Sequence, residues 1–159
     1  MNALTKALAG VFLLLSPWFL VQVFILVVAP DEAIEEMPIC SDSSSNCAHL
    51  GGGEYHRMEV TTVVFEGQSL EATKSLALDY IEEQEGDVLF ESESESEYFV
   101  HFVEHTPFWL FPDDVFLSIT VEDDNSSRIE LHSESRLGYG DLGVNPERLE
   151  LFYEALASD

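Results

Sequence analysis

The sequence predicts an α+β protein in which one N-terminal transmembrane helix precedes an antiparallel five-stranded sheet with two helices. Three observations indicate this class. Residues 8–29 form an uncharged apolar run, residues 59–135 contain short β-branched segments separated by turn residues, and the stretches 69–84 and 145–156 have the spacing of amphipathic helices. Every link between successive strands is short, which favours hairpins and therefore antiparallel pairing.

The apolar run, LAGVFLLLSPWFLVQVFILVVA, has the length of a membrane span. Its 22 residues would extend about 33 Å as a helix, close to the hydrocarbon core of a bilayer at about 30 Å. A cleavable signal peptide normally has a shorter apolar stretch, although the ending Val27-Val28-Ala29 resembles a cleavage site and leaves cleavage open. Lys6 precedes the run and acidic residues follow it, which favours residues 1–7 in the cytoplasm. We therefore expect a single-pass cell-membrane protein, with the membrane as a partner and the domain outside.

Residues 30–55 are expected to be a linker, because they are rich in Pro, Ser, Gly and Glu and lack periodicity. Within the linker, Cys40 and Cys47 bracket SDSSSN, a small loop that can close without strain. Outside the cell, two cysteines normally form a disulfide. A metal site would need two further ligands, and only His49 and His56 lie near. The sequence favours the disulfide.

Residues 56–159 are expected to form the extracytoplasmic α+β domain. Its strand-like segments are EVTTVVF, DVLFESE, EYFVHFVE, VFLSITV and RIELHSES. Ser69 is suited to cap a helix that runs to about Gln84, and Asn145 followed by Pro146 is suited to begin a closing helix. The order strand, helix, four strands, helix matches the helix-grip arrangement of TATA-binding-protein-like folds, an analogy of topology that implies nothing about DNA.

The charge of the chain excludes some classes of partner. The sequence has 31 acidic residues against 6 Lys and Arg, a net charge of −25. Such a surface repels nucleic acid and anionic lipid headgroups. Carboxylates keep a surface hydrated in concentrated salt, where their mutual repulsion is screened, so the composition indicates a halophilic organism. The segment NSS at Asn125 is a candidate glycosylation site in a turn.

The most specific pattern is HSESRLGYGDLGVN, residues 132–145. It resembles the signature of the domain of unknown function 1499 family. CSDSSSNC is similar to the Cys-Asn-Cys segment of that family, and FPDDVFLSI is similar to its Asp-Asp-Val strand. The resemblance covers about residues 38–157 in the expected order. The family implies kinship of fold and no known activity.

Three positions depart from the pattern of the family. His132 and Pro146 stand where members often have arginine, and Pro112 precedes the Asp pair. An anion site built on those two arginines would therefore be weakened in this chain.

The glycine-rich run allows two interpretations. A phosphate loop needs a cation beside converging N–H groups at a helix start, and Arg136 could supply it. Asp141 and the acidic surface oppose an anionic ligand. We favour a structural role, with glycines at positive φ, Arg136 paired with Asp141 or with Asp113 or Asp114, and Asn145 as a cap.

Adjacent Asp113 and Asp114 raise the question of acid/base chemistry by paired carboxylates. Successive strand residues point to opposite faces of a sheet, so both serve one site only if they lie in the preceding turn. Together with His101, His105 and His132 on neighbouring strands they could also ligate a metal. No Gly-x-Ser-x-Gly nucleophile elbow occurs in the sequence. We predict no metal and no cofactor.

We interpret the protein as a non-catalytic, membrane-anchored binding or envelope-associated module. The segment PFWLFP around Trp109 is either a core or membrane-facing turn or a groove for a lipid or protein partner. The alternative is an enzyme or metal-binding protein with a carboxylate, arginine and tyrosine site near residues 113–141. A closed Arg136–Asp141 pair favours the first, and an open cleft shared with Asp114 and His132 favours the second. The candidate site residues are Asp113, Asp114, His132, Ser135, Arg136, Tyr139, Asp141 and Asn145.

Overall fold

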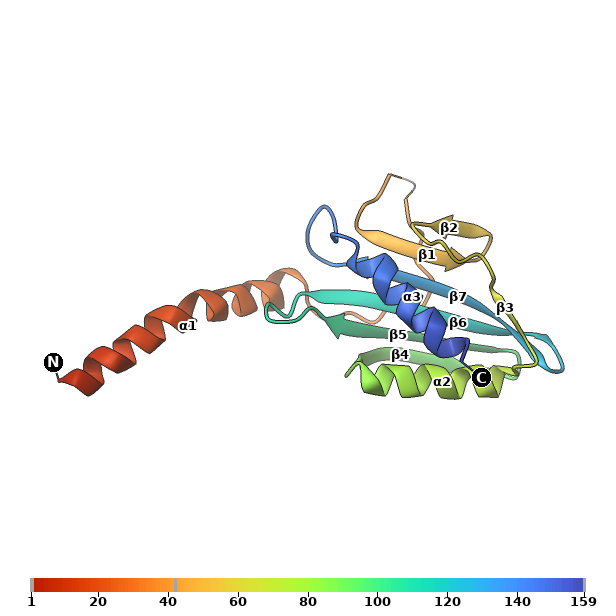
Figure 1. Ribbon diagram of the computed structural model, residues 1–159, viewed down its shortest axis with the longest axis horizontal. Helices are drawn as coiled ribbons and strands as arrows, with labels where there is room; N and C mark the ends of the chain where they lie inside the picture. Colours follow the sequence, from red (N-terminus) through yellow and green to blue (C-terminus); the bar gives the residue numbers. More distant parts are fainter. Residues whose placement is uncertain (1, 42, 159) are drawn as a thin grey trace.

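The computed structural model describes residues 2–41 and 43–158, without the side chains of residues 3, 6–9, 11 and 14. Helix α1 (Ala3–Val28) extends away from a domain in which the described residues form seven strands and two further helices (Figure 1). The sheet order is β2-β1-β7-β6-β5-β4, and β3 also pairs with β7. The elements are β1 (Cys47–Gly51), β2 (Glu54–His56), β3 (Val64–Glu66), α2 (Leu70–Glu83), β4 (Asp87–Glu93), β5 (Glu97–His105), β6 (Pro112–Asp123), β7 (Ser126–Ser135) and α3 (Val144–Leu156).

The prediction of five strands is wrong, since the described sheet has seven, all in antiparallel pairs. Strand β1 and the first two residues of β2 come from residues 30–55, expected to be a linker. The sequence of β1, CAHLG, has no β-branched residue, yet all five of its residues are buried. β1 forms a strand by pairing with residues 131–134 of β7. β3 pairs with residues 126–128, further along the same side of β7. A partner distant in the sequence, rather than local propensity, makes β1 a strand.

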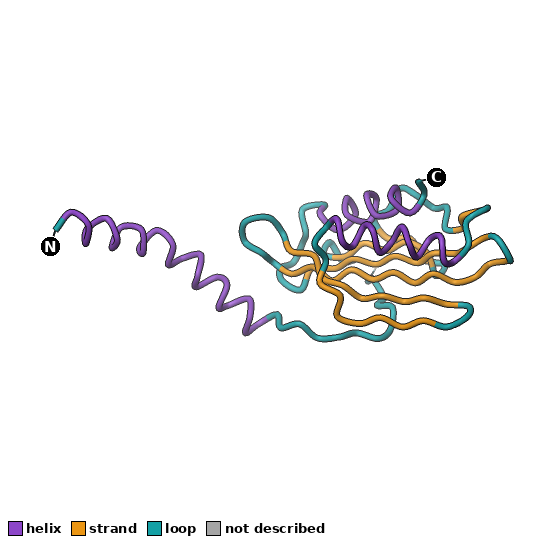
Figure 2. The backbone as a smooth tube through the Cα atoms, turned by 90° about the horizontal axis from the view of Figure 1, so that it is seen from below, coloured by secondary structure: helices purple, strands orange, loops and turns teal. Residues whose placement is uncertain are grey.

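Helices α2 and α3 both cover one face of the sheet (Figure 2). Between them and the sheet lies the core, where the ring of Tyr80 on α2 stacks on Phe152 of α3 with centroids 4.3 Å apart. The strands contribute the alternate apolar residues of that face, among them Leu50, Phe102, Val115, Leu117, Ile119, Ile129 and Leu131. The period-2 pattern of the sequence therefore marks this buried face.

The two domain helices begin differently. Ser69 is the N-cap of α2, as predicted, and its hydroxyl accepts the backbone N–H of Ala72 at 3.4 Å. The N-cap of α3 is Gly143 with a φ of 92°, so the prediction of Asn145 in that role is wrong. The side chain of Asn145 is fully buried and bonds to other segments instead.

No helix within the described residues is long and apolar enough to cross a membrane. The predictions of a transmembrane helix over residues 8–29, of the membrane as partner through it, and of a single-pass protein with its N-terminus inside are therefore wrong. The prediction of a span is based mainly on the absence of charged residues. The described side chains of α1 nevertheless include Ser16, Pro17 and Gln22, which interrupt the apolar sequence. The predicted cytoplasmic segment 1–7 includes residue 1, which is outside the described residues.

The end of α1 contacts the loop of residues 106–111, which joins β5 to β6. The indole N–H of Trp18 donates to the carbonyl oxygen of Phe108 at 2.7 Å, and the amide of Gln22 donates to that of Trp109 at 2.8 Å. Two polar side chains of α1 thus bind the aromatic segment PFWLFP.

Residues 29–40, here called the crossing segment, run over the face of the sheet opposite the helices (Figure 2). The backbone N–H of Ile34 donates to Nδ1 of His101 at 3.1 Å. Buried His49, His132 and Phe116 occupy the same face in neighbouring strands. This segment therefore covers part of the face opposite the helices.

Candidate functional site

A cavity of about 470 Å³ lies where the loop 106–111 meets the glycine-rich motif. Residues from that loop form one wall, residues 135–144 form the other, and Asp113 lies at the start of β6. Most of the lining is apolar, with Trp109, Phe111 and Leu142 as the largest side chains. The side chain of Leu142 is fully exposed, so the cavity opens to solvent beside it.

Backbone strain is concentrated around this cavity. Among the described residues, five non-glycine residues have a positive φ. Leu142, at 55°, lines the cavity, and Phe108 at 70° and Leu110 at 55° lie in the loop 106–111 beside the lining residues Trp109 and Phe111. A fourth, Arg57 at 58°, binds Asp141 of the motif. A non-glycine residue in this conformation costs about 1–3 kcal/mol, and such residues cluster at functional sites.

Asp113 is buried and paired on the helix side of the sheet. Arg148 of α3 donates to it at 2.8 Å and to Glu104 at 2.8 Å. Burial lowers the pKa of Arg148, but the charges and hydrogen bonds of the two carboxylates outweigh burial and raise it. One guanidinium thus serves two carboxylates, which leaves the group with a net charge of −1.

Asp141 is held by Arg57, the residue that follows β2. The guanidinium donates to both carboxylate oxygens, at 2.6 and 2.8 Å, and the backbone N–H groups of Gly143 and Asn145 donate at 2.9 and 3.2 Å. Burial raises the pKa of Asp141, but Arg57 and the hydrogen bonds from Gly143 and Asn145 outweigh it and hold the pKa below its ordinary value. This carboxylate is an organising centre for the turn that precedes α3.

Asp114 lies on the opposite face, under the crossing segment. Arg136 donates to its two oxygens at 2.7 and 2.8 Å, and Nε2 of His101 donates at 2.7 Å. Burial raises the pKa of Asp114, but the hydrogen bonds from Arg136 and His101 and the nearby positive charge outweigh it, so the pKa is lowered. Arg136 also donates to Asp31 at 2.7 Å, and its own pKa is raised chiefly by the hydrogen bond to Asp114.

The structure separates the predicted site residues into two groups. Asp113, Ser135 and Asp141 line the cavity. On the opposite face, Asp114 and Arg136 form an ion pair, and Nδ1 of His132 lies 3.2 Å from Nδ1 of His49. The adjacent carboxylates therefore cannot act on one substrate, and Arg136 does not pair with Asp141.

The remaining predicted residues have structural contacts or none. Asn145 accepts from Ser133 at 2.7 Å and from Arg148 at 2.8 Å, and it donates to the carbonyl of Asn46 at 2.8 Å. Tyr139 is fully exposed at the tip of the motif. The three histidines considered as metal ligands have separate partners. His101 faces Asp114, His132 faces His49, and His105 lies 3.9 Å from Asp87.

Cys40 and Cys47 form the predicted disulfide. The loop between them supports the motif, because Ser45 donates to the carbonyl of Tyr139 at 2.8 Å and accepts from the N–H of Asp141 at 3.1 Å. Asn125 lies exposed in the β6–β7 turn, and its glycosylation stays a prediction.

Sequence reasoning missed Arg57 and Arg148, although a signal was present. The chain has only 6 Lys and Arg against 31 acidic residues, so each cation is conspicuous. In the described residues all four arginines bind carboxylates. The small number of cations indicates that each arginine is a candidate for a specific ion pair. Which carboxylate it binds depends on the fold.

These features define an α+β domain with an apolar, ion-paired pocket beside its most characteristic motif. The chain belongs to the family described as protein of unknown function (DUF1499), whose profile matches residues 32–156. The resemblance seen in the motif is thereby confirmed, and it assigns no reaction. No curated protein matches the sequence.

Proposed function

We propose that this domain is a non-catalytic binding module whose cavity takes a small apolar molecule with a positively charged end. The observation that carries the proposal is the cavity of about 470 Å³ between two strained loops. Its size lies in the range of about 300–1,000 Å³ typical of small-molecule sites. The apolar walls supply binding area, and the strained backbone holds them apart.

The carboxylates of the cavity argue against acid/base catalysis. Asp113 and Asp141 each receive an arginine at 2.8 Å or less. The pKa of Asp141 is held below its ordinary value, whereas a general base near neutral pH needs a raised pKa. The carboxylate of Asp113 is engaged by its hydrogen bond from Arg148. These residues therefore favour binding over the alternative of an enzyme built on residues 113–141.

Charge selects the end group of the ligand. Around Asp113, one arginine serves two carboxylates, and the whole chain carries −25. Trp109 and Phe111 add aromatic rings to the lining, and such rings attract cations. A positively charged end is therefore favoured, and an anionic end is disfavoured.

Three probes with one apolar body test this preference: phenylpropylamine, phenylpropanol and phenylpropionate. The chain has 2 tryptophans, so Trp109 fluorescence is read in a Trp18→Phe background. We expect the amine to bind at least about tenfold more tightly than the carboxylate, a difference of ~1.4 kcal/mol. Equal binding of the three, or an unchanged Trp109 signal with all of them, would contradict the proposal.

A matched pair of variants locates the site. Leu142→Ala removes part of a wall and should weaken amine binding about fivefold, ~1 kcal/mol. Leu151→Ala truncates an exposed leucine of α3 outside the cavity and should leave binding unchanged. Because alanine keeps the Cβ atom, Leu142→Ala does not relieve the positive φ. If both variants bind the amine like the parent, the cavity is not the site.

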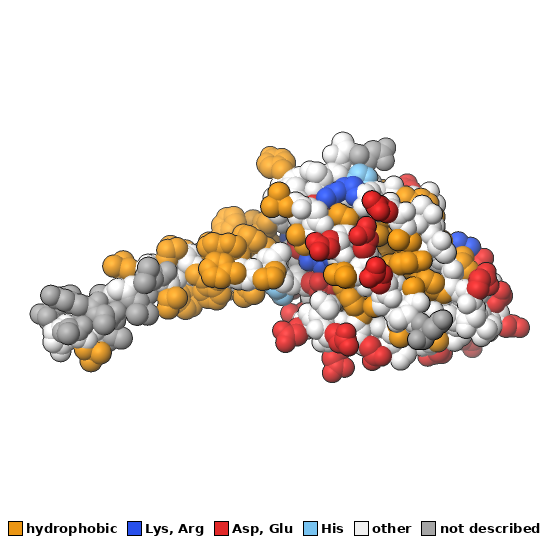
Figure 3. All heavy atoms as spheres, in the orientation of Figure 1, with side chains coloured by type: hydrophobic (Ala, Val, Ile, Leu, Met, Phe, Trp, Pro, Cys, Tyr) orange, Lys and Arg blue, Asp and Glu red, His pale blue; other side chains and the backbone are white. Residues whose placement is uncertain are grey.

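We also propose that the protein works in concentrated salt. Asp and Glu side chains are distributed over the visible face of the domain, whereas hydrophobic side chains gather along α1 (Figure 3). Unpaired carboxylates at this density repel one another in dilute buffer, and dissolved ions screen that repulsion.

A further inference from the structure

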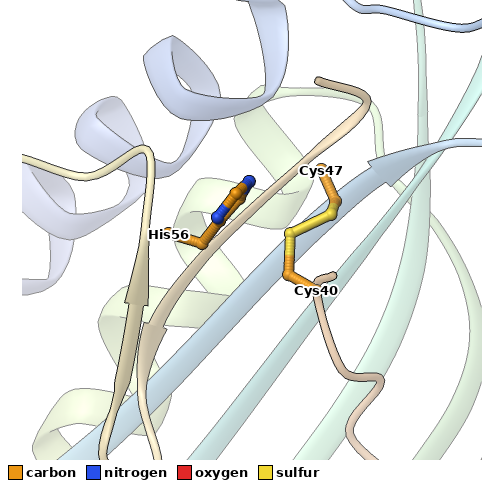
Figure 4. A group of neighbouring side chains, drawn as sticks. All are labelled: Cys40, Cys47 and His56. Carbon is orange, nitrogen blue, oxygen red and sulfur yellow. A yellow bond between two sulfur atoms is a disulfide. The ribbon is translucent and has the colours of Figure 1, made fainter. Parts of the chain in front are cut away.

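We propose that Cys40, Cys47 and His56 form a redox-gated site for a soft divalent metal ion, with Zn²⁺ as the expected ion. The disulfide closes the site, and reduction to two thiols opens it. The sulfur atoms and a ring nitrogen of His56 lie within 4.8 Å of one another. Figure 4 shows His56 on β2 beside Cys47 on β1, with Cys40 at the end of the crossing segment.

The loop between the cysteines is held by contacts that do not involve sulfur. The side chain of Asn46 donates to the carbonyl of Ser135 at 2.6 Å, and the N–H of Ser135 donates back to Asn46 at 3.1 Å. The N–H of Asp141 donates to Ser45 at 3.1 Å. These bonds do not depend on sulfur and hold Ser45 and Asn46 beside Cys47 after reduction, while Cys40 remains only seven residues away along the chain.

His56 is tied to the same loop. One of its ring nitrogens, Nε2, lies 2.8 Å from the carbonyl oxygen of Ser44, and the neighbouring Arg57 donates to the carbonyl of Cys47 at 3.1 Å. The contact of Nε2 with Ser44 therefore orients the ring and leaves Nδ1 for a metal ion. Metal-binding histidines usually have such a contact at the nitrogen that does not bind the metal. Cys40 and Cys47 are buried and His56 is partly buried, which limits the access of water.

The chemistry balances with a dithiol as reductant. A thiolate of the dithiol attacks one sulfur, the second cysteine leaves as thiolate, and the other thiol of the reductant resolves the mixed disulfide. The products are a disulfide of the reductant and two free cysteines. Zn²⁺ then binds both thiolates and the imidazole and displaces two protons, so the site is neutral overall.

The ligand set suits a thiophilic ion with an open position. Two thiolates and one imidazole are ligands of Zn²⁺, and three protein ligands leave the fourth position for water or another ligand. The surrounding surface, with a net charge of −25, concentrates cations near the loop. The proposal does not depend on the apolar cavity, and it would stand if no amine bound there.

Cobalt is a direct probe of this site. The full chain is reduced with a phosphine without oxygen, freed of reductant and titrated with Co²⁺. We expect one ion per chain, a thiolate-to-cobalt charge-transfer band, and displacement of Co²⁺ by Zn²⁺. The oxidised chain should show no band. A reduced chain without the band, or an oxidised chain with it, would overturn the proposal.

Two variants test the ligands. Changes beside a metal ligand cost about 10–100-fold in affinity, so His56→Gln, which removes a ligand itself, should cost at least about tenfold. His105→Gln, at a histidine of β5 outside the cluster, should bind like the parent. Equal affinity of the two variants would remove His56 from the site. Should His56→Gln lack the circular dichroism spectrum of the parent, X-ray absorption of the zinc-loaded parent decides, since two sulfur neighbours support the proposal and their absence refutes it.

Discussion

Arg136 binds Asp114 with the same two-bond geometry that joins Arg128 to Glu122, but in a different environment. Both pairs have N–H···O distances of 2.7–2.8 Å. The side chains of Arg136 and Asp114 are 10% and 6% exposed, whereas those of Arg128 and Glu122 are 44% and 39% exposed. The two pairs therefore separate the effect of burial from that of geometry.

Arg136→Ala should lower the free energy of unfolding by about 3 kcal/mol, because it leaves the buried carboxylate of Asp114 without its main partner. Arg128→Ala is the matched control and should cost less than about 1 kcal/mol, since water solvates Glu122. Urea unfolding at neutral pH measures both. Similar small losses in the two variants would show that Arg136 is not structural.

Acid should weaken the fold through Asp141. Its pKa in the folded chain is lowered by Arg57 and backbone N–H groups, despite burial. A carboxyl with a lower pKa in the folded state stabilises the fold above its unfolded pKa of about 3.9, and this contribution is lost as the pH falls through the folded value. Asp141→Asn should lose about 2 kcal/mol at neutral pH and lose less than the parent on acidification.

The control for this prediction is Asp79→Asn, at an exposed position of α2. Its free energy of unfolding should change with pH as that of the parent does. Both chains share the relief of surface repulsion that protonation brings to such an acidic chain. If Asp141→Asn and Asp79→Asn show the same pH dependence of unfolding free energy, Asp141 does not carry the effect.

Local pattern predicted the elements that are periodic in themselves. The helix expected from Ser69 to about Gln84 is α2. In VFLSITV, Val115, Leu117 and Ile119 lie on the buried face of β6, whereas Val121 is exposed. The alternation rule left open whether Asp113 and Asp114 lie in a strand or in the preceding turn. Both lie in β6, where Arg148 and Arg136 bind them on opposite faces. In these segments the spacing of apolar residues along the sequence both predicts the element and is the reason that it packs against the core.

The elements that sequence reasoning missed depend on distant partners. β1 is a strand because β7 supplies its hydrogen bonds, and the pair Arg57–Asp141 joins residues 84 positions apart. The positive φ of Leu142 has no local signal, since leucine disfavours it intrinsically. The sequence therefore located the candidate site at the glycine-rich motif. It did not predict the ion pair of Asp141 with Arg57 or the cavity beside the motif.

Salt should stabilise the domain. Raising KCl from about 0.01 M to 1 M shortens the screening length from about 30 Å to 3 Å. With a net charge of −25, the free energy of unfolding in urea should increase over this range, most steeply at low salt. NaCl should act like KCl, and sucrose should not reproduce the steep initial rise. A flat response to both salts would rule out adaptation to salt by surface charge.

Asn145 should be more important than a helix cap. Loss of a capping side chain costs about 1 kcal/mol. The buried amide of Asn145 instead joins β7, α3 and the cysteine loop through Ser133, Arg148 and Asn46. Asn145→Ala leaves several of these groups without a partner, so we expect a loss of about 2–3 kcal/mol.

Asn125→Ala makes the same chemical change in an exposed turn and should cost less than about 0.5 kcal/mol. Thermal unfolding measures both variants, and hydrogen exchange of the backbone N–H of Asp141 adds a local readout. That N–H donates to Ser45 in the loop that Asn145 anchors through Asn46, so its exchange should accelerate in Asn145→Ala and stay unchanged in Asn125→Ala. A stability loss without faster exchange at Asp141 would mean that Asn145 supports α3 alone, and the cysteine loop would then be held by its remaining contacts with β7.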